Sequence, residues 1–412
     1  MAVLHPTKTV QPLQPRYVSR FACTGSACED NCCTGWTVHI DKKTFNAYRQ
    51  TQHPGLAERL TQDVKRLRSK GSDREYASIQ LRPDTAACPF LEDKLCGVQR
   101  DLGEDKLSNT CATYPRTIRQ VGRRHEQALT LSCPEAARLA LLDSDAMDFA
   151  DDAKSLVRGE AVTAIPAAKG LSHELMTELR FFALQLMKTE VLPLWIRLAT
   201  LGLFCHELTQ RLKAGDLAPI TSLPQQFTAM IASGEAAQAL EGLQPDHVAQ
   251  SVAFAGLWRL KRGAGRSAAQ RTVRDAVVNG LGADLATQTL SRDTLIARYR
   301  SGVERLPEAM KDVPWLLDHY VINEMFLEVF PFGDSGPYEH FLKLVTRLGV
   351  VRFMLAAQCN APDLPDGAQL VRTVQVFCRD YQHDVHFATA VNTALKNAGW
   401  DGLDRIYRFL KT

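Results

Sequence analysis

Cysteine crowding is the feature that most constrains this 412-residue sequence. Eight of its eleven cysteines fall between Cys23 and Cys133, and only Cys205, Cys359 and Cys378 lie beyond them. The first sixteen residues contain three prolines and no apolar run, so we expect no secretory signal and a cytoplasmic location. In a reducing compartment, dense cysteines indicate metal ligation or redox chemistry better than a disulfide framework.

Charge and hydropathy exclude several classes of partner. The chain carries 49 basic and 46 acidic side chains, a formal charge of +3, which argues against coating nucleic acid or an anionic membrane. The most apolar stretch, residues 191–208, contains Pro193 and Arg197 and is too short and polar to cross a bilayer. We expect neither nucleic acid nor membrane as a partner. The basic run from Arg259 to Arg274 is expected to be a solvated helix face.

The pattern of turns and apolar residues predicts a mainly α protein with an irregular N-terminal part. We expect an N-terminal extension (1–16), a cysteine-rich metal-binding domain (17–142), a connection (143–170) and an all-α helical domain (171–412). The first domain includes a helical stretch at residues 42–70, broken at Pro54-Gly55. In the second domain, helices are expected at residues 172–189, 192–213, 224–232, 247–261, 268–280, 292–303, 313–329, 338–349, 369–381 and 384–397.

The spacing of the clustered cysteines favours an iron–sulfur centre. The candidate ligands are Cys23, Cys28, Cys32, Cys33, Cys88, Cys96, Cys111 and Cys133. The second four are scattered, unlike the close pairs of zinc ribbons and fingers, whereas iron–sulfur clusters tolerate such gaps. Zinc and buried unligated thiols remain the alternatives. Cys28, Cys32 and the adjacent Cys33 do not form the Cys-x3-Cys-x2-Cys loop of radical enzymes that use S-adenosylmethionine.

Four cysteine-containing segments also resemble a known family, the bacterial flagellin lysine-N-methylases. These segments are residues 23–36 (CTGSACEDNCCTGW), 88–97 (CPFLEDKLCG), 107–116 (LSNTCATYPR) and 131–138 (LSCPEAAR). The cysteine-rich part is also similar to a broader group described as zinc- or iron-chelating proteins. Residues 194–202 and 323–332 extend the resemblance into the helical region, so that it covers most of the chain.

The resemblance implies transfer of a methyl group from S-adenosylmethionine to lysine side chains of flagellin, in the cytoplasm before export. It also implies a 4Fe-4S cluster in the cysteine-rich domain. The sequence has no glycine-rich loop between a strand and a helix, as doubly wound methyltransferases use, so an unusual donor site is expected. The size of the helical domain suggests that it recognises the protein substrate.

The reaction would need a neutral amine. Since lysine has an ordinary pKa of about 10.4, neutralising it at pH 7 costs roughly 4.6 kcal/mol unless the site helps. Tyr114, Glu29 and Asp30 lie beside cysteines and are the candidate catalytic residues. For each residue a non-catalytic role is favoured, as a packing residue for Tyr114 and as solvated turn residues for the two acids. The cluster itself has two possible roles, as an anchor for the donor or as a structural staple.

Two other functions fit the same residues. The cysteine-rich part could chelate zinc or iron in a binding or maturation protein, with helices that serve a partner. Alternatively, the chain could be a cluster-dependent oxidoreductase. Bound metal and methyl transfer distinguish these three functions, while the oligomeric state is not determined by sequence.

Overall fold

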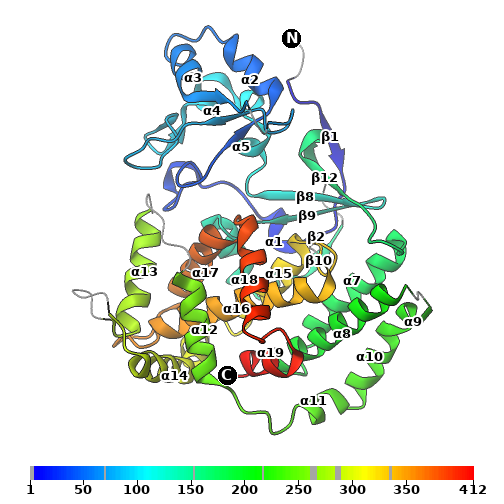
Figure 1. Cartoon of the computed structure of the whole chain (residues 1–412). Coiled ribbons are helices and arrows are strands. Elements are labelled where there is room, and N and C mark those ends of the chain that lie inside the picture. Colours follow the sequence, from blue (N-terminus) through cyan, green and yellow to red (C-terminus); the bar gives the residue numbers. More distant parts are fainter. Residues whose placement is uncertain are drawn as a thin grey trace.

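The computed structural model describes residues 4–68, 71–151, 154–215, 218–259, 267–283, 289–333 and 336–412. Figure 1 shows a small unit containing α2–α5 at one end, a helical body at the other, and strands β1, β8, β9 and β12 between them. Within the described ranges, no helix is long and apolar enough to cross a membrane. The chain thus consists of three regions, which are the small unit, the strands and the helical body, and the helical body is the largest.

The small unit combines short helices with two small sheets. A three-stranded sheet has the order β3-β5-β4, and β6 pairs with β7 as a hairpin. The predicted helix at residues 42–70 is only partly correct, because Val64 starts a strand that pairs with Ile79. The elements are β3 (His39–Ile40), α2 (Lys42–Arg49), α3 (Ala57–Asp63), β4 (Val64–Arg66), β5 (Ala77–Ile79), β6 (Leu91–Glu92), β7 (Leu95–Cys96), α4 (Gly97–Leu102) and α5 (Asn109–Thr113).

The strands between unit and body come from the segments expected to be an extension and a connection, together with a hairpin from the expected cysteine-rich domain. From the N-terminal segment, β1 (Thr7–Val10) and β2 (Gln14–Pro15) pair antiparallel with β11 (Ser155–Arg158) and β10 (Phe149–Ala150). The hairpin β8 (Arg116–Val121) and β9 (Arg124–Leu129) adds β12 (Val162–Ile165) in parallel to β8. Apart from the β8–β9 hairpin, these strands have two to four residues, too few to show their own alternation, and each is held by a partner distant in sequence.

The helical body confirms the mainly α prediction, since every element from α7 onward is a helix. Ser172 caps α7 as predicted, and its side chain accepts a hydrogen bond from the Leu175 amide. Part of the basic run, and the end of the helix predicted at 247–261, lie outside the described residues. The helices are α1 (Arg16–Ser19), α6 (Pro134–Leu141), α7 (His173–Met187), α8 (Leu194–Ala214), α9 (Ala218–Thr221), α10 (Leu223–Ala232), α11 (Glu235–Ala239), α12 (His247–Arg259), α13 (Ala268–Gly280), α14 (Arg292–Ala309), α15 (Leu316–Leu327), α16 (Pro337–Gln358), α17 (Gly367–Tyr381), α18 (Val385–Asn397) and α19 (Leu403–Leu410).

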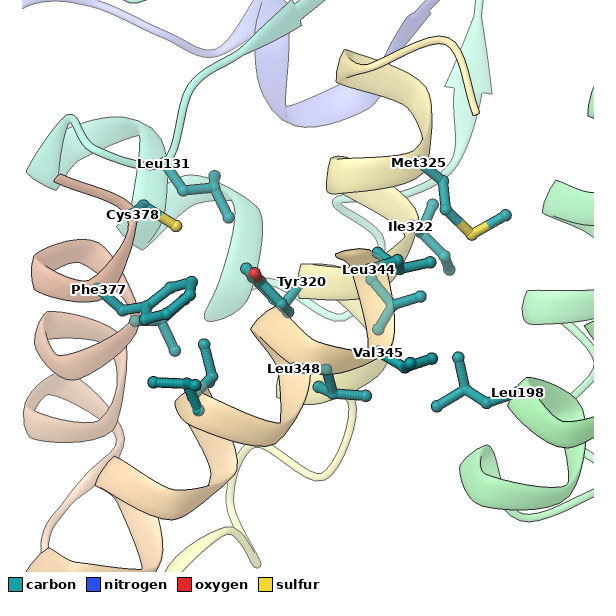
Figure 2. Packing of buried hydrophobic residues seen from close by; sticks show 14 of the residues in the cluster. Leu131, Leu198, Tyr320, Ile322, Met325, Leu344, Val345, Leu348, Phe377 and Cys378 are labelled. Atoms are coloured by element: carbon teal, nitrogen blue, oxygen red, sulfur yellow. The ribbon is translucent and has the colours of Figure 1, made fainter. Parts of the chain in front are cut away.

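Helix α16 runs through the centre of this body. Figure 2 shows Leu344, Val345 and Leu348 of α16 between side chains of α15, α17 and α8, including Tyr320 and Phe377. All five are buried. Such burial is the main stabilising contribution to a helical fold, at roughly 25 cal/mol per Å² of apolar surface.

Two glycines let neighbouring helices approach the α16 backbone. A Cβ at Gly280 of α13 would lie 1.9 Å from the Ala357 carbonyl oxygen, and one at Gly302 of α14 would lie 2.0 Å from that of Ala356. Neither distance is sterically possible, so α13 and α14 can pack this closely only with glycine at these positions.

Two separate hydrophobic cores distinguish the small unit from the helical body. The small unit has its own core of twelve buried residues between Val38 and Leu107. The larger core contains the helices together with Tyr17 of α1, Leu129 of β9 and Leu141 of α6. Side chains assigned by sequence to the cysteine-rich domain therefore pack within the helical body.

A buried ion pair joins the strands to the helices. Arg180 of α7 donates to both carboxylate oxygens of Glu126 on β9, at 2.8 and 2.7 Å. Their side chains are 0% and 2% exposed, so neither charge has access to water to compensate for loss of its partner.

Replacing Arg180 by Met should destabilise the protein by about 3–5 kcal/mol, because it leaves the Glu126 carboxylate buried and unpaired. Urea unfolding followed by circular dichroism measures this. Replacing Glu126 by Leu in the same chain should recover much of the loss, since both charges are then removed. Lys311→Met, which breaks the exposed pair with Glu308, is the control and should leave the midpoint unchanged. A single Arg180→Met variant as stable as the control would contradict this account.

Candidate functional site

Local structure brings the separated cysteine segments together. The Cys88 amide donates to the Cys33 carbonyl at 2.7 Å, which joins the first cysteine segment to the second. Asp93 and Lys94 have φ values of 47° and 63°, a two-residue turn that returns the chain to place Cys96 opposite Leu91.

Four thiols gather in the small unit. The Cys33 thiol is an electrostatic neighbour of Cys88 and Cys96, and Cys111 is a neighbour of the same two. Cys88 and Cys96 also influence one another. Cys88 belongs to the core of the small unit, and the other three pack against it. We call Cys33, Cys88, Cys96 and Cys111 the thiol quartet.

The remaining four predicted ligands form a looser set. Cys133, which precedes α6, has Cys28 and Cys32 as electrostatic neighbours. Cys32 is an electrostatic neighbour of Cys33, Cys96 and Cys111, so it lies beside the quartet, but its residue is exposed. Cys23 is exposed, and the Arg116 guanidinium is near it. All eleven cysteines are free, so no disulfide competes with a metal for these sulfurs.

Burial sets the protonation of the thiols. It raises the pKa of Cys88 to about 11 and that of Cys111 to about 12, so both are protonated at neutral pH. A hydrogen bond with the Cys33 thiol lowers the pKa of Cys32 to about 7 and raises that of Cys33 itself. Binding of a metal to the quartet must therefore displace protons.

The type of ligand atom in the quartet suits a soft metal centre, whereas the arrangement of the four sulfurs does not. Sulfur is the preferred ligand of zinc and of iron–sulfur clusters, and four thiols match the number that either centre needs. Nevertheless, among the described residues no group of three or more His, Cys, Asp or Glu side chains is arranged to hold a metal ion. The quartet thus has the kind and number of ligands that a centre needs, but its sulfurs are not arranged to hold a metal ion.

Tyr114 connects the cysteine-rich region to the turn that follows α17. Its hydroxyl lies 3.0 Å from the Ser132 Oγ, which lies 2.8 Å from Nε2 of His383. Trp36 completes the group, with its ring centre 5.8 Å from that of Tyr114 and 6.1 Å from that of His383. Burial raises the pKa of Tyr114 well above its ordinary value, so the phenol is a hydrogen-bond partner rather than a base at neutral pH.

The two acidic candidates anchor the first cysteine segment to the helices. Asp30 is 3% exposed, pairs with Arg379 at 2.8 Å and accepts from Gln375 at 3.0 Å, both on α17. Glu29 pairs with Arg138 of α6 at 2.6 Å. Their role as bases is a prediction that nothing here tests, and their contacts are those of structural ion pairs.

A buried charge network beside this junction was not predicted from sequence. Arg347 of α16 pairs with Glu324 at 3.2 Å and Glu328 at 2.7 Å. Gln382 donates to Glu324, and Thr130 donates to Gln382, which extends the network to the segment before Cys133. Burial raises the pKa of Glu324 to about 7. The sequence signal for this network was the pair Glu324 and Glu328, two carboxylates four residues apart in an apolar helical segment.

Comparison with known proteins gives a consistent result. The family model for the FliB lysine N-methylase C-terminal domain matches residues 180–409, more than half of the chain. The chain is 31% identical over 245 residues to Lysine-N-methylase of Salmonella typhimurium (strain LT2), and equally similar to that of Salmonella choleraesuis (strain SC-B67). It is 35% identical over 141 residues to Flagellar biosynthetic protein FliU of Salmonella muenchen, across 34% of this chain and 82% of that protein.

The extent of each alignment shows which part of the chain is related to these proteins. The match spans 58% of this chain and 58% of each of the two curated lysine N-methylases. No solved structure matches the chain. The family model covers the body from the middle of α7 to α19, and begins after the cysteine-rich region. The chain belongs to the FliB lysine N-methylase family.

Proposed function

We propose that this protein is an S-adenosylmethionine-dependent lysine N-methylase that modifies flagellin in the cytoplasm. The observation that carries the proposal is the family match over residues 180–409. Relatives named as lysine N-methylases and as a flagellar biosynthetic protein support the reaction and the flagellar substrate. The helical body offers the surface on which a protein substrate would bind.

Methyl transfer to lysine makes modest chemical demands. A neutral amine attacks a sulfonium methyl group directly, so the site must remove a proton from the ammonium and align the two reactants. Neither step needs a radical or an electron carrier. A helical body that binds the protein substrate and holds the donor in a crevice would meet both demands.

For the cysteine-rich region, we propose a 4Fe-4S cluster held by Cys33, Cys88, Cys96 and Cys111. The support is their shared neighbourhood in one small core and the preference of such clusters for four thiolates. With four protein ligands the cluster would act as a structural staple, and Cys28, Cys32 and Cys133 would pack beside it. A small unit with twelve buried core residues gains from such a cross-link.

The proposed methyl transfer to flagellin can be measured directly. Incubating the purified protein with flagellin and S-adenosylmethionine should increase the mass of flagellin by one methylene per methyl group added, and peptide mapping should place each on a lysine. Omitting the donor is the control. Zinc without iron and no mass gain would favour the chelating protein, and redox cycling without mass gain would favour the oxidoreductase.

The iron content of cysteine variants distinguishes the quartet from the other cysteines. In anaerobically purified protein, Cys111→Ala should abolish most of the bound iron, because it removes one of the four thiolates. Cys205→Ala is the matched control, since Cys205 is also a buried thiol but lies on α8. Iron and sulfide analysis measures both variants.

The same measurement tests the division of the cysteines. Cys23→Ala should keep its iron, because the exposed Cys23 lies outside the quartet. Cys359→Ala and Cys378→Ala should keep it as well, since both side chains are in the core of the helical body. Iron lost from Cys23→Ala but retained in Cys111→Ala would contradict the assignment.

A further inference from the structure

A cavity in the helical body has the features of a small-molecule site. It has a volume of about 430 Å³ and lies between the end of α7, the start of α8 and the first turns of α15. Sites for small molecules and cofactors are typically roughly 300–1,000 Å³. Its rim residues Ser144, Lys188 and Glu190 are exposed, so the cavity opens to solvent.

The walls of the cavity are held in fixed orientations. Trp315, which precedes α15, donates from Nε1 to the Leu141 carbonyl at 3.1 Å. His319 lies 2.9 Å from the Ala140 carbonyl through Nδ1, so that nitrogen carries the proton and Nε2 keeps its lone pair. The two rings are 6.2 Å apart. These contacts preorganise a flat aromatic wall beside an imidazole.

The charged residues of the cavity include a buried cation. Arg197 is 5% exposed, pairs with Asp318 and donates to the Met187 carbonyl, while its Nε has no hydrogen-bond partner. Lys188 donates to the Met147 carbonyl at 3.0 Å. With Asp148 and Glu190, the lining has three carboxylates, two cations and one histidine. Its net charge with neutral histidine is therefore 2 − 3 = −1.

We propose that this cavity binds the methyl donor, S-adenosylmethionine. This inference rests on the proposed function. The donor carries an ammonium, a sulfonium and a carboxylate, so its net positive charge complements the net negative lining. The face of Trp315 suits a purine or a sulfonium, and Lys188 suits the carboxylate. The cavity thus provides an aromatic wall and charges of both signs for one ligand.

The location has a consequence for the thiols. Cys133 precedes α6, and Ala140 and Leu141, which orient the cavity walls, lie at the other end of that helix. A helix of eight residues is about 12 Å long. A donor in this cavity is therefore held by side chains of the body, about the length of α6 away from Cys133.

Calorimetric titration of the iron-loaded, full-length protein with S-adenosylmethionine, in the absence of flagellin, tests the proposal. Lys188→Met and Trp315→Leu should each weaken binding at least about tenfold, and Trp315→Phe should keep more affinity than Trp315→Leu because it retains a ring. Lys213→Met, an exposed lysine of α8 outside the cavity lining, is the matched control and should bind as the unmodified protein does. Circular dichroism melting verifies that each variant is folded.

The outcomes separate this inference from the proposed function. Folded Lys188→Met and Trp315→Leu variants with unchanged affinity would overturn the cavity as the donor site, while methyl transfer by the unmodified protein would still stand. Loss of binding on removal of iron, with the two variants unaffected, would place the donor at the thiols instead. Absence of both donor binding and methyl transfer in the unmodified protein would remove the proposed function as well.

Discussion

Packing of four thiols in and against a small hydrophobic core is the constraint on which the cysteine-rich region depends. A neutral thiol packs there as a small apolar group, and burial accordingly keeps Cys88 and Cys111 protonated. A cluster would replace those protons with iron and cross-link four segments of a unit that has few buried residues of its own. The same sulfurs therefore stabilise the unit weakly by packing and would stabilise it strongly by ligation.

The small unit is fixed to the helical body by polar contacts. Asp30 pairs with Arg379 of α17, Glu29 pairs with Arg138 of α6, and Tyr114 reaches His383 through Ser132. Any rearrangement of the first cysteine segment on loading a cluster would be transmitted to α6 and α17. Since α6 also orients Trp315 and His319 through its carbonyl groups, the thiols and the cavity share one structural element. A cluster held by the thiols would therefore be linked through α6 to the proposed donor cavity.

The helices were largely predictable from sequence, because their signals are local. Ser172 and the apolar stripe that follows it define α7, and Ser267 and Gln270 form a capping box at the start of α13. The strands β1 and β11 were not predictable, since each is short and pairs with a segment about 150 residues away in sequence. For the site, the cysteines were found by type and spacing, whereas their division into a quartet and a looser set depends on tertiary packing.

The cavity shows most clearly that groups formed by tertiary packing cannot be predicted from local sequence. Nothing in the local sequence links Lys188, which follows α7, to Trp315, which precedes α15, although both line the cavity. Arg197 was noted only as a charge in an apolar segment, although it is a buried cation paired with Asp318. Such side chains become a recognisable group only when the packing of helices is known.

The most direct test of the account is an anomalous difference map recorded at the iron absorption edge from crystals grown without oxygen. The account predicts one strong peak within bonding distance of the Cys33, Cys88, Cys96 and Cys111 sulfurs. A peak among Cys28, Cys32 and Cys133, or anomalous signal at the zinc edge alone, would contradict it.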